Sequence, residues 1–146
     1  MKLDRVTNWN LPGISPVPAS PGSRGRILVV DDDISIRHAS AMMLARFGFE
    51  VDVAEDGDDA WEILQQGGYD LLITDNNMPR MSGLDLLKKL HAARMDLPFI
   101  MATGAVPLEE FIRYPWIVPA ATLLKPYSIS ELFETVEKIL QDGAAL

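Results

Sequence analysis

Five short apolar runs alternate with longer stretches of mixed polarity from Arg26 to the end of the chain. The runs cover residues 27–30, 51–53, 71–73, 99–102 and 123–124. Four of them are continuously apolar, which is typical of strands covered on both faces of a parallel sheet. The second alternates with Glu50 and Asp52, a pattern that favours an edge strand.

Apolar residues between these runs recur every three or four positions, which is the period of an amphipathic helix. The clearest sets are Ile36, Ala39, Met43 and Phe47 in the first helical stretch, and Leu132, Val136, Ile139 and Leu140 in the last. Three glycines are expected to end helices, namely Gly48, Gly67 and Gly143. Strands that alternate with helices predict right-handed crossovers, and hence an α/β, doubly wound parallel sheet with five helices.

Polar residues follow four of the five predicted strands. They are Asp31, Asp32 and Asp33 after the first, Asp75, Asn76 and Asn77 after the third, Thr103 after the fourth, and Lys125 after the fifth. Because ligands of doubly wound folds bind beyond the carboxyl ends of the strands, we expect these side chains to form one pocket. Clustered carboxylates repel one another, and a hard cation such as Mg²⁺ relieves that repulsion. A carboxylate can also act as a nucleophile and form an aspartyl phosphate.

Each of these residues has an ordinary structural interpretation when it is taken alone. Asp33 is a typical N-cap, Asp75 with its two asparagines can be a turn, and Lys125 can be a surface lysine. Their joint occurrence at the ends of four strands instead predicts a phosphoryl-transfer site that holds Mg²⁺.

The composition of the chain argues against several classes of function and site. The chain has 146 residues, enough for one domain, and 13 Lys and Arg against 21 Asp and Glu give a formal charge of −8. This balance argues against nucleic-acid binding, because phosphate contacts need a basic face. The lack of cysteine excludes disulfides and zinc–thiolate sites. No apolar run approaches the ~20 residues of a membrane span, so we expect a cytoplasmic protein that makes no membrane contact.

Residues 1–25 differ in composition from the rest of the chain. Four prolines alternate there with glycine and serine, at Pro12, Pro16, Pro18 and Pro21. Such a stretch buries little surface and is typical of a flexible leader or linker. We therefore expect a leader over residues 1–25, one folded domain over residues 26–142 and a short tail over residues 143–146.

The strand-end motifs resemble those of response-regulator receiver domains of two-component signalling, including single-domain receivers of the chemotaxis type. The matching segments are ILVVDDD at 27–33, EDG at 55–57, DLLITDNNMP at 70–79, SGL at 82–84, ATG at 102–104 and KP at 125–126. The resemblance covers residues 26–142. It implies a flavodoxin-like sheet with the strand order 2-1-3-4-5, an order that chemotaxis members of this family exemplify.

The resemblance also implies a role for each residue of the pocket. Asp75 would be the phosphoacceptor, and Thr103 and Lys125 would contact the phosphoryl group. Four residues would hold Mg²⁺, namely Asp31, Asp32, Asp75 and Asn77. Asp32 would bind it directly, Asp31 mainly through water, and Asn77 through its backbone carbonyl. The peptide bond before Pro126 is often cis in this family.

The chain departs from the family pattern between Thr103 and Lys125. Thr122 stands where many members have an aromatic switch residue. Prolines at 107 and 115 predict a short fourth helix of about two turns, beginning near Pro107 and ending by Tyr114. We expect Ile117 and Val118 to fill the space of a longer helix. We expect Tyr114 and Trp116 to form a face that binds a downstream partner or a second copy of the chain.

These observations predict a stand-alone receiver that accepts a phosphoryl group from a histidine kinase or phosphotransfer protein and signals by protein–protein contact. Its own phosphorylation and dephosphorylation would be its only catalysis. Three alternatives remain open. A Mg²⁺-dependent phosphatase or phosphotransferase for small substrates commonly needs a second acid where Asn77 stands, and a substrate cap. The others are an interaction module that is never phosphorylated and a receiver cut from a hybrid histidine kinase.

Overall fold

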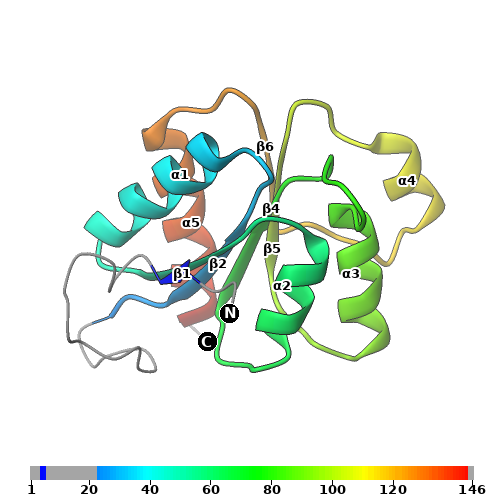
Figure 1. Cartoon of the computed structure of the whole chain (residues 1–146), viewed down its shortest axis with the longest axis horizontal. Coiled ribbons are helices and arrows are strands. Elements are labelled where there is room, and N and C mark those ends of the chain that lie inside the picture. The colour runs from blue at the N-terminus through cyan, green and yellow to red at the C-terminus, as the bar shows by residue number, and fades with distance from the viewer. Residues whose placement is uncertain (1–3, 6–22, 145–146) are drawn as a thin grey trace.

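The computed structural model describes residues 4–5 and 23–144, and its sheet has the strand order β1-β3-β2-β4-β5-β6 (Figure 1). Five strands pair in parallel: β2 (Arg26–Val30), β3 (Glu50–Ala54), β4 (Leu71–Thr74), β5 (Phe99–Thr103) and β6 (Ala121–Leu124). Counted in chain order, these five have the order 2-1-3-4-5. The predicted fold class is therefore confirmed.

A sixth strand, β1 (Asp4–Arg5), extends the sheet beyond β3 and was not predicted. It is antiparallel, with Asp4 opposite Val53 and Arg5 opposite Asp52. The second predicted strand is thus the edge of the parallel set but not of the whole sheet. Of the expected leader, residues 1–3 and 6–22 lie outside the described residues.

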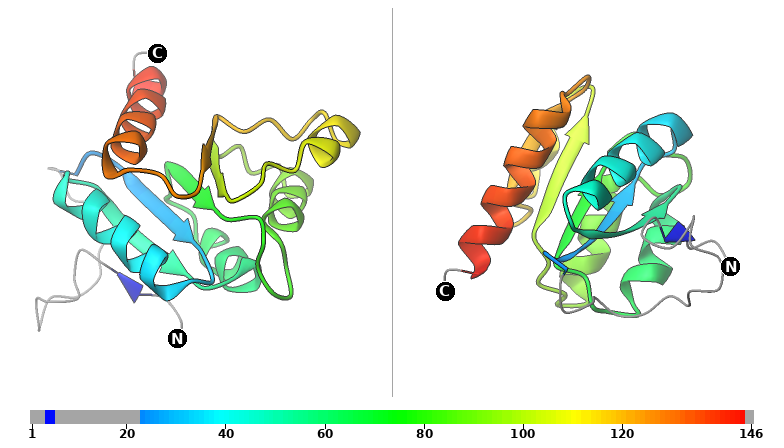
Figure 2. Two further views of the ribbon diagram at one scale, coloured as in Figure 1. Left: turned by 90° about the horizontal axis from the view of Figure 1, so that it is seen from above. Right: turned by 90° about the vertical axis from the view of Figure 1, so that its left-hand side faces the viewer.

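Helices cover both faces of the sheet. Figure 2 shows α1 (Ile34–Arg46) and α5 (Ile129–Ala144) on one face, with α2 (Gly57–Leu64) and α3 (Gly83–Ala92) on the other. Glycine is only a weak helix breaker, and α5 continues through Gly143, where a tail was expected. No helix within the described parts of the chain combines the length and the apolar character that crossing a membrane requires.

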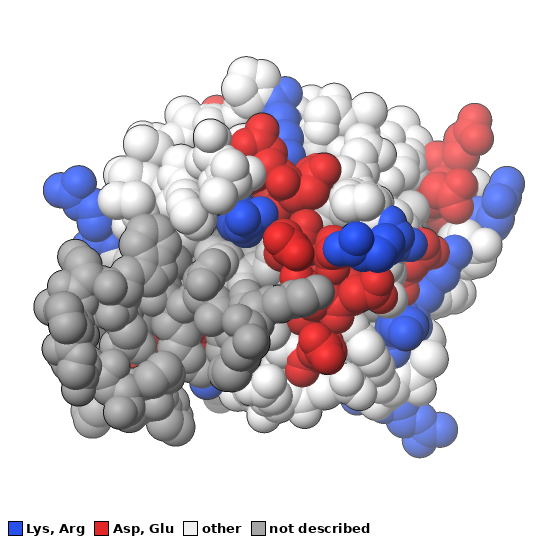
Figure 3. Space-filling view, in the orientation of Figure 1, with Lys and Arg blue, Asp and Glu red and all other residues white. Residues whose placement is uncertain are grey.

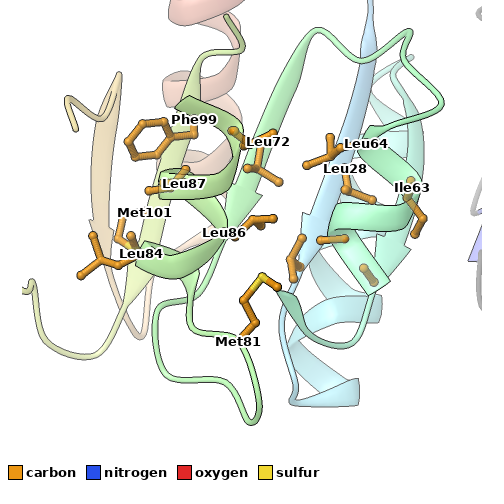
Figure 4. Close-up of a cluster of buried hydrophobic side chains, with 14 of the residues drawn as sticks. Leu28, Ile63, Leu64, Leu72, Met81, Leu84, Leu86, Leu87, Phe99 and Met101 are labelled. Carbon is orange, nitrogen blue, oxygen red and sulfur yellow. The ribbon is translucent and has the colours of Figure 1, made fainter. Parts of the chain in front are cut away.

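Strands β2, β4 and β5 have long apolar runs because each contributes residues to two cores. Ile27 and Val29 of β2 pack with α1 and α5, whereas Leu28 and Val30 pack with α2 and α3. Successive side chains of a strand point to opposite faces, so both sets must be apolar. Figure 4 shows the second core, with Leu28 and other strand residues facing the leucines of α2 and α3.

The helix α4 (Leu108–Arg113) is short, as the two prolines predicted. Pro107 precedes its first residue and Tyr114 follows its last. All six residues of the helix are described, and none of them is buried. In Figure 1 the helix stands at the right, away from the sheet. The side of β6 that a longer helix would cover is open, since Leu124 is 58% exposed.

The chain after α4 corrects one prediction. Ile117 is 5% exposed and joins the second core, as expected. Val118 is 71% exposed, so the prediction that it fills the same space is wrong. Ile117 and Val118 follow a turn at 115–116, and the chain there is not helical. In extended chain, neighbouring side chains point in opposite directions, so one is buried and the other is exposed.

Candidate functional site

Three carboxylates meet at the carboxyl edge of the sheet. Asp31 and Asp32 follow β2, Asp75 follows β4, and β2 and β4 are neighbours in the sheet. One oxygen of each carboxylate lies within 4.8 Å of the other two. Asp31 and Asp75 are only 4% and 6% exposed, whereas Asp32 is open to solvent. Three carboxylates at this spacing are a donor set that fits a hard divalent cation.

Lys125 supplies a positive charge to the same pocket. Its Nζ donates a hydrogen bond to Asp31 Oδ2 at 2.6 Å and lies 3.3 Å from Asp75 Oδ2. Burial lowers the pKa of Lys125, but the hydrogen bond to Asp31 and the charges of Asp31 and Asp75 outweigh this effect and raise it. The ammonium group is therefore protonated at neutral pH and offsets part of the carboxylate repulsion.

Two further hydrogen bonds fix the position of Asp31, one to its side chain and one to its backbone. Its Oδ1 accepts the backbone N–H of Asp33 at 2.9 Å, and its carbonyl oxygen accepts a hydrogen bond from Arg37 Nη1 of α1 at 2.8 Å. Burial raises the pKa of Asp31, although the hydrogen bonds from Lys125 and Asp33 oppose it. The sequence did not point to Arg37, whose role depends on a side chain reaching back to the backbone.

The loop after β4 fixes the Asp75 side chain. Asp75 Oδ1 accepts the backbone N–H groups of Asn76 at 2.8 Å and Asn77 at 3.4 Å. The Asn76 side chain in turn accepts the N–H of Leu84 at 3.0 Å, which joins the loop to α3. At Gly83 a Cβ atom would lie 2.3 Å from the Asp75 carbonyl oxygen, so only glycine fits between α3 and the loop.

Thr103, at the end of β5, is fully buried. Its hydroxyl donates to the carbonyl oxygen of Ala105 at 3.3 Å, within the loop that leads to α4. Asn77, the expected carbonyl ligand, is exposed in the loop after β4. The structure thus brings together Asp31, Asp32, Asp75 and Lys125, and the Lys125–Pro126 peptide bond is cis, as the resemblance implied.

The sequence profile of the response regulator receiver domain matches residues 27–137. The chain belongs to this family. The family prediction from the motifs is therefore confirmed, and Asp31, Asp32 and Asp75, which belong to two of these motifs, are the carboxylates that meet in the pocket.

Relatives of the receiver domain agree with this assignment. The transcriptional regulatory protein DltR of Streptococcus agalactiae is 34% identical over 111 residues, which are 76% of this chain and 50% of that protein. A CheY-like receiver domain of Methanospirillum hungatei matches with a TM-score of 0.75 and 30% identity, over 81% of this chain and 94% of the other. The chain spans about half the length of the curated relatives it matches.

A third relative was solved with a metal. The response regulator TrrA of Thermotoga maritima, in complex with Mg²⁺–BeF, matches with a TM-score of 0.70 and 32% identity, over 79% of this chain and 98% of the other.

An apolar groove of about 510 Å³ opens beside the receiver's acidic pocket. It lies between α1 and the segment that joins β6 to α5, and its lining includes Ile36, Met43, Pro126 and Ile129. Lys125 lines the groove as well as contacting Asp31 and Asp75. A protein bound in the groove would therefore lie next to the carboxylates.

Proposed function

We propose that this receiver domain accepts a phosphoryl group on Asp75 from a histidine kinase or phosphotransfer protein, and that phosphorylation changes its affinity for another protein. One observation carries the proposal: the buried Asp75 carboxylate lies against Lys125 and within 4.8 Å of the Asp31 and Asp32 carboxylates. A carboxylate in this setting has its partner charges already in place for phosphoryl transfer.

The transfer needs positioning and charge neutralisation rather than further covalent chemistry. An Asp75 carboxylate oxygen forms the new bond to phosphorus while the bond from phosphorus to the donor's histidine nitrogen breaks. Asp31, Asp32, Asp75 and the Asn77 carbonyl would hold Mg²⁺, and the metal would supply neutralisation of the charge on the transferred oxygens. Lys125 stabilises a further oxygen from the other side of the pocket.

The apolar groove beside α1 suits the phosphodonor. Its lining is almost entirely apolar, with Ile36, Met42 and Met43 on one wall and Ile129 on the other. An amphipathic helix that carries the phosphohistidine would bury its apolar face there. Because Lys125 lines the groove, the histidine would then face Asp75.

Phosphotransfer from purified partners tests the proposal directly. Each member of a panel of phosphorylated histidine kinases and phosphotransfer proteins is mixed with the receiver and Mg²⁺, and label on both proteins is followed. We expect rapid transfer from at least one donor. Failure with every donor and with acetyl phosphate would contradict the proposal, and multiple-turnover hydrolysis of small phosphate esters would favour the phosphatase alternative.

Mg²⁺ is expected to stabilise the fold through this pocket. At ten times its dissociation constant, a ligand specific to the folded state adds about 1.4 kcal/mol of stability, which raises the melting temperature by a few degrees. Thermal melts with and without Mg²⁺ should show this shift in the wild type and in Asp96→Ala, an exposed acid near the opposite edge of the sheet. Asp32→Ala should erase the shift, and an unchanged shift in that variant would contradict the site.

The output surface is proposed around Trp116. This side chain is 44% exposed and stacks on His91 of α3, with 4.3 Å between ring centroids. Tyr114 meets it edge-on at 5.8 Å, and Lys88 Nζ lies 4.0 Å from the Tyr114 ring centroid. A groove of about 380 Å³ between α3 and residues 116–120 adjoins this cluster. Exposed aromatic anchors beside a groove are frequent centres of protein contact.

Thr103 would connect the phosphorylation site to this surface. Its hydroxyl now bonds to the Ala105 carbonyl, at the start of the segment that leads through α4 to Trp116. When the hydroxyl turns to a phosphoryl oxygen on Asp75, the hydrogen bond to Ala105 is lost. The exposed α4, which buries none of its own described residues, is then free to shift.

Trp116 should report this change and contribute to partner binding. In a variant with Trp9 and Trp61 replaced by Phe, the emission of Trp116 is expected to change on phosphorylation. Trp116→Ala should weaken partner binding or self-association by more than about tenfold, because aromatic anchors dominate interface energetics. Phosphorylation of Asp75 should be unaffected. Emission that stays constant on phosphorylation would contradict the coupling.

A further inference from the structure

Arg80 ties the phosphoacceptor loop to the neighbouring α2. Its guanidinium forms an ion pair with Asp56 through Nη2, and its Nε lies 3.6 Å from Asp58 Oδ2. Asp56 is 1% exposed and caps α2, with its Oδ1 accepting the Asp59 N–H at 2.9 Å. One end of the pair is therefore a fixed, buried carboxylate that belongs to the framework of the fold.

The backbone of Arg80 has a conformation that arginine rarely adopts. Its φ angle is +65°, in the left-handed region that favours glycine. The loop passes close to α2 at the next residue, because a Cβ atom on Gly57 would lie 2.6 Å from the Met81 carbonyl oxygen. A disfavoured backbone persists where its surroundings hold it, and the Asp56 ion pair is one of those constraints.

The ion pair acts at the same edge of the sheet as the acidic pocket. Val30 of β2 and Ala54 of β3 are register partners, and Asp32 and Asp56 each come two residues later. Asp75 and Asn77, the two remaining expected ligand positions, belong to the loop that carries Arg80. The pair thus connects the loop-borne ligands to the edge that carries Asp31 and Asp32. Figure 3 shows the acidic side chains of this region as a band, with basic side chains among them.

We propose that Arg80 is a positioning residue for Mg²⁺, which sets the distance between the loop-borne ligands and the Asp31–Asp32 pair. The inference rests on the proposed function, since it assumes that this pocket binds the metal. Arg80 itself is not a ligand. It acts by holding the β4–α3 loop against the α2 N-cap before the metal arrives, which lowers the cost of assembling the site.

Positioning and simple electrostatics predict opposite results when the arginine is removed. Loss of a positive charge near an acidic pocket should strengthen cation binding, by an amount that screening keeps small for a side chain as exposed as Arg80. Loss of the tether should weaken binding, because the loop must be ordered by the metal itself. The sign of the change therefore separates the two explanations.

Arg80→Gly is the decisive variant, because glycine accepts the φ angle and removes only the side chain. Arg94→Gly is a matched control: Arg94 is also exposed, also has a positive φ of 58°, and follows α3 near the opposite edge of the sheet. Mg²⁺ affinity is measured by calorimetry and by the Mg²⁺ dependence of the melting temperature. The expected dissociation constant rises about three- to tenfold in Arg80→Gly and stays unchanged in Arg94→Gly, and Arg80→Lys should recover part of the loss.

A double-mutant cycle with Asp56→Asn, which keeps a good N-cap, should show that the two losses are not additive. Unchanged or tighter Mg²⁺ binding in Arg80→Gly, or an equal loss in Arg94→Gly, would overturn the proposal while the proposed function stands. A wild type without Asp32-dependent Mg²⁺ binding would overturn both.

Discussion

Asp75→Asn is expected to abolish phosphorylation, both by acetyl phosphate and by a phosphohistidine donor. The amide has no anionic oxygen to attack phosphorus, so the loss should be complete. The fold should survive, because the amide oxygen can still accept the N–H groups of Asn76 and Asn77. Removing one of three clustered charges should also raise the melting temperature without Mg²⁺.

Intact-mass measurement after incubation with acetyl phosphate and Mg²⁺ is the direct test. The wild type and Asp85→Asn should gain one phosphoryl group, since Asp85 is an exposed carboxylate in the first turn of α3. Asp75→Asn should gain none. Label that persists in this variant would assign the acceptor to another residue of the pocket, with Asp31 and Asp32 the first to examine.

The inner strands β2, β4 and β5 are predictable because each of them faces two helical layers. In β2, Ile27 and Val29 serve one core and Leu28 and Val30 the other, so the run is apolar without interruption. The position of the candidate site can also be predicted from the strands, because they run parallel. Once the strands are parallel, the residues after β2, β4, β5 and β6 must lie at one edge, whatever the details of the loops.

Prediction of burial from the apolar pattern fails where charged residues form buried ion pairs. Asp52 interrupts the apolar residues of β3 in the alternating pattern that favoured an edge strand, yet its side chain is buried, with 2% exposed. Arg26 lies 3.1 Å from it in an ion pair, and the Tyr69 hydroxyl donates to the same carboxylate oxygen. Hydropathy describes single side chains, whereas the burial of Asp52 depends on partners that are distant in sequence.

Contacts between side chains and backbone were missed for a related reason. Arg37 holds the Asp31 carbonyl, and Asn76 holds the first turn of α3. Neither residue type at its position signals such a contact. Similarly, β1 has only two residues, too few for any periodicity, and its pairing with β3 follows from tertiary structure.

Lys125→Ala is expected to separate phosphate capture from the response to it. The lysine contacts the carboxylates without creating the nucleophile, so Asp75 should still be phosphorylated, though more slowly. The Trp116 emission change should be largely lost, because the phosphoryl group loses a contact on the β6 side of the pocket. Complete loss of phosphorylation, as in Asp75→Asn, would contradict the role assigned to Lys125.

The same substitution should strengthen Mg²⁺ binding while it weakens the metal-free fold. Lys125 Nζ lies 2.6 Å from Asp31, and its removal leaves three clustered carboxylates without their nearest cation, at a cost of about 2 kcal/mol. Mg²⁺ then takes over that neutralising role, so its dissociation constant should fall about tenfold, which equals 1.4 kcal/mol of added affinity. Calorimetry on Lys125→Ala, with the exposed Lys138→Ala as control, measures this change. Arg80→Gly also removes a cation near the pocket but should weaken Mg²⁺ binding, because Lys125 competes with the metal whereas Arg80 holds its ligands in place. If both variants bound Mg²⁺ more tightly, net charge alone would control the site, and the distinction between a competing and a positioning cation would be wrong.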